Sequence, residues 1–191
     1  MAVSDVFRVH HQTRRRAPQA RAVAEACSEF LVSHVEDLVT ETGQRTGHHS
    51  PSMTVTTHTE QLKTQGQNDC VDITEAVQAA VVKAKITQGL ATIFVTGSTA
   101  GVTTIEYEPG LVKDLNEALR RLFPEGLRYA HHETGGDDNG FSHLRAAFIG
   151  PSLSVPIAEG TLQLGTWQQI VLVDFDTRPR SRSYLIHLLG E

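Results

Sequence analysis

The spacing of apolar residues divides the chain into a helical first segment and a longer, strand-rich remainder. Between Gln19 and Thr42, apolar residues recur at steps of three and four, which predicts an amphipathic helix that Gly43 can end. After Met53, stretches that alternate apolar and polar residues, or that are rich in β-branched residues, predict strands. The predicted strands cover residues 54–64, 90–97 with a continuation through a glycine-rich bend to residue 108, 152–158, 161–165, 167–176 and 183–189.

Two main helices interrupt these strands. Asp72 or Thr74 could cap the first helix, and its predicted buried face consists of Ile73, Val77, Ala80, Val81 and Ala84. The second begins at Pro109, because a proline there gives up only an N–H that would lack a partner. Its predicted inward residues are Leu111, Leu115, Ala118, Leu119 and Leu122. Two helices inserted among antiparallel strands, without regular alternation of strand and helix, predict an α+β fold rather than a doubly wound sheet.

The composition and the pattern of apolar residues change near residue 50. Residues 1–50 are predicted to form an N-terminal extension that contains one helix and a polar linker, GQRTGHHSPS, whose glycines and proline favour loops. Residues 51–191 contain all the predicted strands and both main helices. The length of 191 residues favours one domain over two. We therefore predict a single folded domain at 51–191 preceded by an extension.

Composition narrows the classes of partner. The net charge is -5, which argues against nucleic acid as the main partner because phosphate binding normally requires a basic face. A small anionic substrate remains possible, since it needs only a local group of Arg and Lys. No apolar run reaches eighteen residues and no secretory signal pattern follows Met1, so neither a membrane span nor secretion is expected. Cys27 and Cys70 form no metal-type pair, which favours a reduced, cytoplasmic protein.

The stretch HHETGGDDNGFSHLR, residues 131–145, holds most of the candidate chemistry. It contains three of the ten histidines and an acidic pair, and its glycines would let backbone approach a ligand closely. This composition predicts a loop that brings polar groups together. The sequence after this loop predicts a two-strand hairpin that turns at Glu159 and Gly160 and runs into a long strand to residue 176. This hairpin would hold the loop on a rigid base.

Within this stretch, His132 and His143 bracket Asp137 and Asp138, and each imidazole could bind one metal ion. Two histidines and a carboxylate suit Zn or another divalent ion; the alternative is that these histidines only form hydrogen bonds. Arg145 could bind a phosphate or carboxylate with two hydrogen bonds, or form a salt bridge to the acidic pair.

Glu106, His131 and the arginines of residues 177–182 each allow more than one interpretation. Glu106, at the end of a predicted strand, could be a general base, a metal ligand or a solvent-facing residue. His131 fits a strand or surface position. The arginines of TRPRSR, residues 177–182, lie in a predicted turn where they could meet solvent or a substrate phosphate.

Two blocks of sequence resemble one family. The run HHETGGDDNGFSHLRAAFIGPSLSVPIAEGTLQLGTWQQIVLVDF resembles the signature region of the YjbQ-like proteins, which are often labelled secondary thiamine-phosphate synthases. GSTAGVTTIEYEP is similar to the family's earlier block. The resemblance extends from about Met53 to Glu191 and leaves residues 1–50 outside.

The resemblance implies a compact α+β fold with an antiparallel, β-sandwich-like core, and a homotrimer with sites near the subunit interfaces. It points to the following site residues: Glu106, His132, Asp137 or Asp138, His143, Arg145 and the block Gly165, Thr166, Trp167 and Gln168. Two positions depart from the family pattern, because relatives carry histidine where Gly97 and often where Phe141 stand. A metal-ligand set would then consist of His132, His143 and carboxylates.

The function implied by the resemblance is of thiamine-phosphate synthase type, joining a pyrimidine diphosphate to a thiazole phosphate. Arg145, and a divalent metal (Zn or Mg) held by His132 and His143, would stabilise the departing diphosphate. Glu106 and the pair Asp137 and Asp138 would complete the catalytic set, and no organic cofactor is expected. Two alternatives remain: a non-catalytic trimer that binds a small ligand or metal, and a metal-dependent hydrolase.

Overall fold

A computed structural model describes residues 52–191, so the predicted helix between Gln19 and Thr42 and the linker after it lie outside the described residues. The described part contains the following elements: β1 (Thr54–Thr64), β2 (Asp69–Asp72), α2 (Thr74–Ala84), β3 (Gln88–Val95), β4 (Ala100–Ile105), α3 (Pro109–Leu122), α4 (Ala130–Thr134), α5 (Gly140–Ile149), β5 (Ser152–Ala158), β6 (Thr161–Leu162), β7 (Gln169–Asp174) and β8 (Arg180–Gly190). None of the helices in this part is long and apolar enough to cross a membrane.

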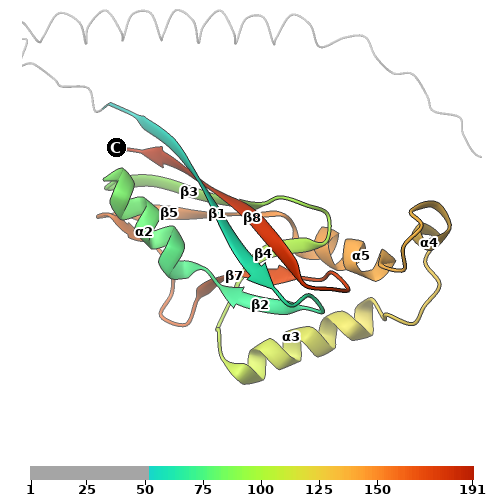
Figure 1. Cartoon of the computed structure of the whole chain (residues 1–191). Coiled ribbons are helices and arrows are strands. Elements are labelled where there is room, and N and C mark those ends of the chain that lie inside the picture. Colours follow the sequence, from blue (N-terminus) through green and yellow to red (C-terminus); the bar gives the residue numbers. More distant parts are fainter. Residues whose placement is uncertain (1–51) are drawn as a thin grey trace, which may run out of the picture. The chain divides into compact units, whose positions relative to one another are not determined.

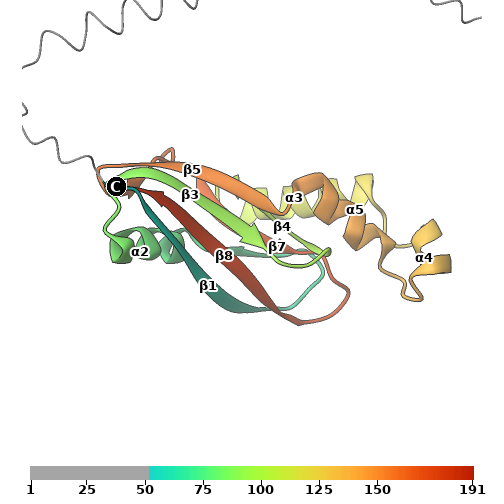
Figure 2. The same cartoon turned by 90° about the horizontal axis from the view of Figure 1, so that it is seen from above.

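The strands form two antiparallel sheets. One has five strands in the order β1-β8-β3-β5-β6, and the other has three in the order β2-β7-β4. Figure 2 shows the four long strands of the larger sheet side by side in this order. In Figure 1, α3 lies beyond the three-stranded sheet, on the side away from the five-stranded one. The predicted α+β fold with an antiparallel, sandwich-like core is therefore confirmed.

The main core lies between the two sheets and α2. Alternate residues of each long strand point inward, among them Ile93 and Ile186, and they pack with Val77 and Val81 of α2. These four side chains are at most barely accessible to solvent, as the predicted buried face of α2 requires.

A second core lies on the other side of β7. Ile170 and Leu172 belong to the main core, whereas Val171 and Val173 pack against Leu119 of α3 and Ala146 of α5. Because β7 is buried on both faces, its apolar residues form a continuous run and do not alternate with polar ones.

The predicted start of α3 is confirmed, but its predicted face is only partly buried. Pro109 occupies the first turn, and the Glu108 side chain caps the helix by accepting from the backbone N–H groups of Gly110 and Leu111. Leu119 is buried, whereas Leu122 is 58% exposed. The reason is that the helix packs on the second core through Val112, Leu115, Leu119 and the following Phe123, a face rotated from the predicted one.

The predicted loop at residues 131–145 is wrong. Most of it forms α4 and α5, and only residues 135–139 lie between them. Phe141, Ser142, Arg145 and Ala146 recur at helical spacing and are all buried. The Ser142 hydroxyl also donates to the backbone oxygen of Phe175, 2.6 Å away. Burial of this face therefore outweighs the loop-forming tendency of the glycines around it.

The hairpin at Glu159 and Gly160 is confirmed, but the long strand after it is not one element. Both residues have positive φ, 53° and 73°, as a tight turn between antiparallel strands requires. β6 then ends at Leu162, and β7 begins at Gln169 in the other sheet. The backbone of Gln168 donates to the oxygen of Gly165 over 2.9 Å, so a turn carries the chain from one sheet to the other.

Candidate site around helices α4 and α5

His131 and His143 lie against each other between α4 and α5. Their ring centroids are 4.5 Å apart, and His131 Nε2 lies 3.3 Å from Asp137 Oδ1. That nitrogen has no hydrogen-bond partner, so the carboxylate lies beside the ring without receiving a directed bond. The side chains of Asp137 and His131 are 60% and 36% exposed, although His131 Nε2 itself is shielded from solvent. Two imidazoles and a carboxylate therefore share one partly exposed surface.

His132 takes part in different contacts. Its Nε2 accepts from the backbone N–H of Gly140 over 3.3 Å, and its Nδ1 lies 3.7 Å from Asp138 Oδ1. The ring packs edge-on against Tyr129 at 5.4 Å. Because Nε2 accepts a hydrogen bond, the proton of the neutral ring is on Nδ1, which faces the carboxylate. The Nε2 lone pair is therefore occupied and not available to a metal in this arrangement.

The structure thus pairs His143 with His131, not with His132. In residues 52–191, no group of three His, Cys, Asp or Glu side chains is close enough to hold one metal ion. The expected divalent metal does not fit the side chains of a single copy as they stand, and it remains a prediction. The signal that could have identified His131 is that it stands next to His132 in the sequence. Side chains of adjacent residues on a helix point about 100° apart, so only one of these two histidines can face α5.

Two glycines let the backbone approach these rings. A Cβ atom on Gly135 would lie 2.5 Å from the His131 ring. A Cβ atom on Gly140 would lie 2.6 Å from the Tyr129 Cβ and 3.2 Å from His132 Nε2. Real Cβ atoms essentially never come within 3.0 Å of such atoms, so a side chain at Gly135 would displace the His131 ring and one at Gly140 would displace Tyr129.

Arg145 points into the protein. Its side chain has no exposed surface, and its guanidinium donates to Asn68 Oδ1 (3.0 Å), Glu125 Oε1 (3.3 Å) and the backbone oxygen of Phe123 (2.7 Å). It also lies 4.8 Å from the centre of the Phe141 ring. Burial lowers the pKa of Arg145, and Glu125 opposes that effect. Its carboxylate partner is therefore Glu125 and not Asp137 or Asp138.

Glu106 and the Gly165–Gln168 block lie together at the ends of β4 and β7. Ile105 and Gln169 are paired in the sheet, so Glu106 follows β4 where Gln168 precedes β7. Gln168 donates to Thr104 Oγ1 (3.0 Å) and accepts from the backbone of Gly165 (3.1 Å). Glu106 is exposed, and Trp167 is 71% exposed. Within the described residues, no hydrogen bond or ion pair joins this group to the histidines of α4 and α5.

Sequence reasoning missed a buried ionic network. Arg182 donates from Nε to Asp174 Oδ2 (2.7 Å) and from Nη2 to Asp174 Oδ1 (2.5 Å) and Thr99 Oγ1 (2.8 Å). Arg180 Nε donates to Asp176 Oδ2 over 2.7 Å. The predicted turn at residues 177–182 is therefore too long: Arg180 and Arg182 belong to β8 and are held by protein carboxylates. The Asp-x-Asp and Arg-x-Arg spacings at facing strand ends were the available signal.

One departure from the family pattern lies over this network. A Cβ atom on Gly97 would be 3.3 Å from Arg182 Nη1. Gly97 also has a positive φ of 116°, a backbone conformation that residues other than glycine rarely adopt, so a histidine at this position would be strained.

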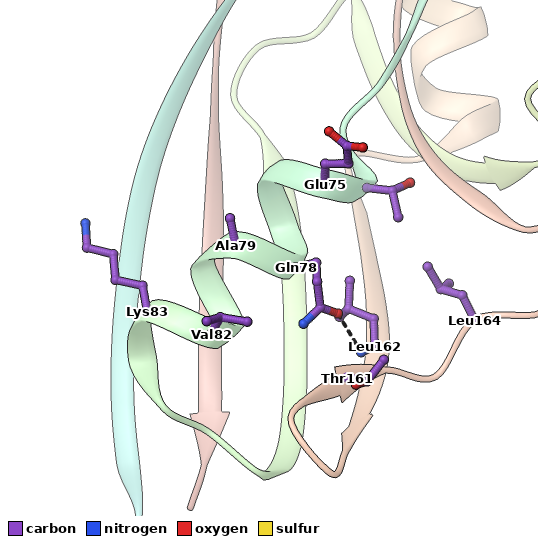
Figure 3. Close-up of a pocket in the computed structure, with 9 residues that line it drawn as sticks. Glu75, Gln78, Ala79, Val82, Lys83, Thr161, Leu162 and Leu164 are labelled. Carbon is purple, nitrogen blue, oxygen red and sulfur yellow. Dashed lines mark hydrogen bonds between the residues drawn. The ribbon is translucent and has the colours of Figure 1, made fainter.

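An open groove of about 670 Å³ lies between α2 and β6 (Figure 3). Its lining is mainly apolar and includes Ala79, Val82, Leu162 and Leu164. Gln78 bridges the two walls, donating to the oxygen of Gly160 and accepting from the N–H of Leu162 (2.9 and 3.0 Å). Lys83 is its one cationic side chain, and none of the predicted site residues lines it. The groove is therefore poorly suited to a diphosphate.

Residues 58–191 match the family described as UPF0047 protein YjbQ-like. A UPF0047 protein of Mycobacterium bovis is 43% identical over 113 residues, which cover 59% of this chain and 85% of that protein. A UPF0047 protein of Methanocaldococcus jannaschii is 33% identical over 132 residues, covering 69% and 92%. A solved structure of a YbjQ-like protein of unknown function from Sulfolobus solfataricus has a TM-score of 0.70 and 35% identity, covering 73% of this chain and all of that one.

Proposed function

This chain belongs to the YjbQ-like UPF0047 family, and on that premise we propose that it is an enzyme of thiamine-phosphate synthase type. The substrates would be a pyrimidine diphosphate and a thiazole phosphate. The observation that supports this proposal is the partly exposed group of His131, His143 and Asp137 between α4 and α5. Imidazoles can bind phosphate oxygens and give up a proton near neutral pH.

The proposed reaction forms one bond and breaks one. The thiazole nitrogen attacks the methylene carbon of the pyrimidine, and the bond from that carbon to the diphosphate oxygen breaks with its electron pair on oxygen. The products are the thiazolium phosphate and pyrophosphate, which takes up a proton according to the pH. Charge develops on the leaving oxygen, so a catalyst has to supply cationic or hydrogen-bonding groups there.

In this proposal, His143 and His131 bind the diphosphate and donate the proton that it takes up. Asp137 Oδ1 lies 3.3 Å from His131 Nε2, so its negative charge would stabilise a positive charge on that imidazole. Glu106 would position the second substrate or accept a proton, as its exposed place at the end of β4 permits. Arg145 acts as a positioning residue, since its guanidinium is bound to Asn68, Glu125 and Phe123. No step is assigned to a metal.

The test is product formation from the two purified precursors. We expect His143→Ala to lower the rate about 100-fold, which is the usual contribution of a general acid or base. His48→Ala, in the predicted linker, is expected to leave the rate unchanged. Assays with and without a chelator, together with elemental analysis at neutral pH, test the predicted divalent metal. No turnover by the unaltered protein under any of these conditions would contradict the proposal.

A non-catalytic ligand-binding protein is the second candidate. It is favoured by the inward direction of Arg145, which removes the one guanidinium of the stretch from any anion at the surface. Binding of either precursor without turnover would support this candidate. A metal-dependent hydrolase, the third possibility, would release phosphate from simple phosphate esters.

We further propose that the protein is a homotrimer, as the family resemblance implies. β1 and β6 are the edge strands of the larger sheet, and such edges are commonly protected by association. Light scattering should then give a mass near three chains.

A further inference from the structure

A small pocket lies where β1 ends and β8 begins, and we call it the strand-end pocket. Its volume is about 280 Å³, and it is lined by Lys63, Thr64, Gln65, Pro179, Arg180 and Ser181. Strand pairing sets Lys63 opposite Ser181 and Thr64 opposite Arg180, so both strands contribute to it. Pockets for whole small molecules usually measure about 300–1,000 Å³. The strand-end pocket therefore suits a small group such as a phosphate.

The strand-end pocket is basic, although the chain as a whole is acidic. Two of its six residues are cations and none is Asp or Glu, whereas the chain has 17 basic and 22 acidic residues. The groove between α2 and β6 is lined by one lysine and one glutamate. Lys63 is exposed, and it forms no ion pair with any residue of the range 52–191. A local excess of positive charge of this kind attracts anions.

Arg180 is oriented by one carboxylate and keeps its other donors. Its Nε donates to Asp176 Oδ2 over 2.7 Å, and its side chain is 36% exposed. The two terminal nitrogens of Arg180 form no hydrogen bond within the described part of the chain. Asp176 offsets much of the charge of Arg180, so Arg180 supplies directed N–H donors and Lys63 supplies net charge. A guanidinium that is already held in place loses little freedom when it binds an oxyanion.

The loop after β1 ties the strand-end pocket to α5, the helix that carries His143. Gln65 begins this loop, and the backbone N–H of Asn68 donates to the oxygen of Asp174 over 2.8 Å. The side chain of Asn68 accepts from Arg145 of α5 over 3.0 Å. Figures 1 and 2 both show the end of β1 and the beginning of β8 on the side of the molecule where α5 lies. The pocket and His143 are thus parts of one connected region.

Electrostatics also connects the strand-end pocket with the histidine group. The hydrogen bond to Asp176 raises the pKa of Arg180 above its ordinary value, and the charge of Asp137 adds to this effect. Asp137 Oδ1 lies 3.3 Å from His131 Nε2. The same carboxylate therefore acts on a histidine of the candidate site and on an arginine of the pocket.

We propose that the strand-end pocket binds the terminal phosphate of the diphosphate substrate, with Lys63 and Arg180 as its binding residues. This inference rests on the proposed function and adds a second part to its diphosphate site. The imidazoles of His131 and His143 would face the phosphate next to the bond that breaks. Asp137 offsets positive charge on those imidazoles, so the negative charge of a leaving diphosphate calls for further cations. The strand-end pocket supplies them, whereas Arg145 points into the protein.

The test is binding of pyrophosphate to the full-length protein, measured by isothermal titration calorimetry. Pyrophosphate is a product of the proposed reaction and needs no turnover to bind. We expect Lys63→Ala and Arg180→Gln each to raise its Kd about tenfold, because each removes a charge-assisted hydrogen bond. Lys83→Ala is the matched control, since it removes the same charge from the groove between α2 and β6 and should leave the Kd unchanged. Thermal melts check that Arg180→Gln, which also loses its bond to Asp176, is folded during the titration.

Each outcome has a definite meaning. A tenfold loss of affinity in the two pocket variants, with none in Lys83→Ala, supports the proposal. Unchanged affinity in Lys63→Ala would overturn it, as would an equal loss in Lys83→Ala or no binding of pyrophosphate by the unaltered protein. Inorganic phosphate that binds as tightly as pyrophosphate would overturn the assignment to a diphosphate. Pyrophosphate binding through the pocket, without turnover of the two precursors, would contradict the synthase activity and leave the pocket in place.

Discussion

Replacing Asp174 with asparagine should lower the free energy of unfolding by about 3–5 kcal/mol, the usual cost of removing one partner of a buried ion pair. Asp174 has no exposed surface, and its carboxylate accepts from Arg182, from the Thr64 hydroxyl and from the backbone of Asp176. The substitution leaves the buried Arg182 with only its longer contact to Asp176 Oδ2, at 3.4 Å, as an ion pair. At about 2–4 °C per kcal/mol, the melting temperature should fall by roughly 10 °C.

Asp138→Asn is the matched control. The same chemical change is made there on a side chain that is 95% exposed, so stability should change by less than about 0.5 kcal/mol. Urea unfolding gives both free energies. A loss smaller than about 1 kcal/mol in Asp174→Asn would mean that the network contributes little to stability.

The same network makes the fold sensitive to acid. Burial would raise the pKa of Asp176, but the hydrogen bonds from Arg180 and Thr177 outweigh it, and the pKa lies below the ordinary value. A depressed pKa stabilises the fold above the ordinary carboxyl value and stops doing so as pH falls through the folded value. Stability should therefore decline below about pH 4, and Asp176→Asn should show less of this decline.

Local pattern was sufficient for the long strands and for the two main helices. β1 has the bounds that its alternating threonines predict, and α3 begins at Pro109 where the missing N–H has no cost. These features depend on residues close in sequence. β7 was assigned to a longer strand, because an apolar run does not indicate where a chain passes from one sheet to another.

Tertiary contacts decided the rest. α5 contains a glycine and follows two others, and it is helical because residues distant in sequence hold its buried face: Ser142 bonds Phe175, Arg145 bonds Asn68, and Ala146 packs in the second core. The arginines of β8 were assigned to a turn, since their carboxylate partners become visible only when β7 and β8 lie close together. In the candidate site, the sequence predicts that His132 lies beside His143, whereas the structure places His131 there. The rotation of α4 relative to α5 decides which imidazole meets His143, and the sequence does not show that rotation.

Arg145→Met should cost about 3 kcal/mol of stability and serves to separate a structural from a catalytic role. The methionine fills much of the space but leaves Asn68 Oδ1, Glu125 and the Phe123 oxygen without their donor. Arg121→Met is the control, because Arg121 is 81% exposed and pairs only with Glu117 on the helix surface. That variant should lose no more than about 0.5 kcal/mol.

A catalytic and a structural role of Arg145 predict changes in different quantities: the kinetic constants for the first and the melting temperature for the second. A group that binds substrate raises KM or lowers kcat at temperatures where the protein is fully folded. A positioning group lowers the melting temperature, and Arg145→Lys restores part of it because a cation can again reach Glu125. We expect the second pattern. An Arg145→Lys protein with an unchanged melt and a raised KM would instead place the guanidinium on the substrate, and α5 would then have to move to expose it.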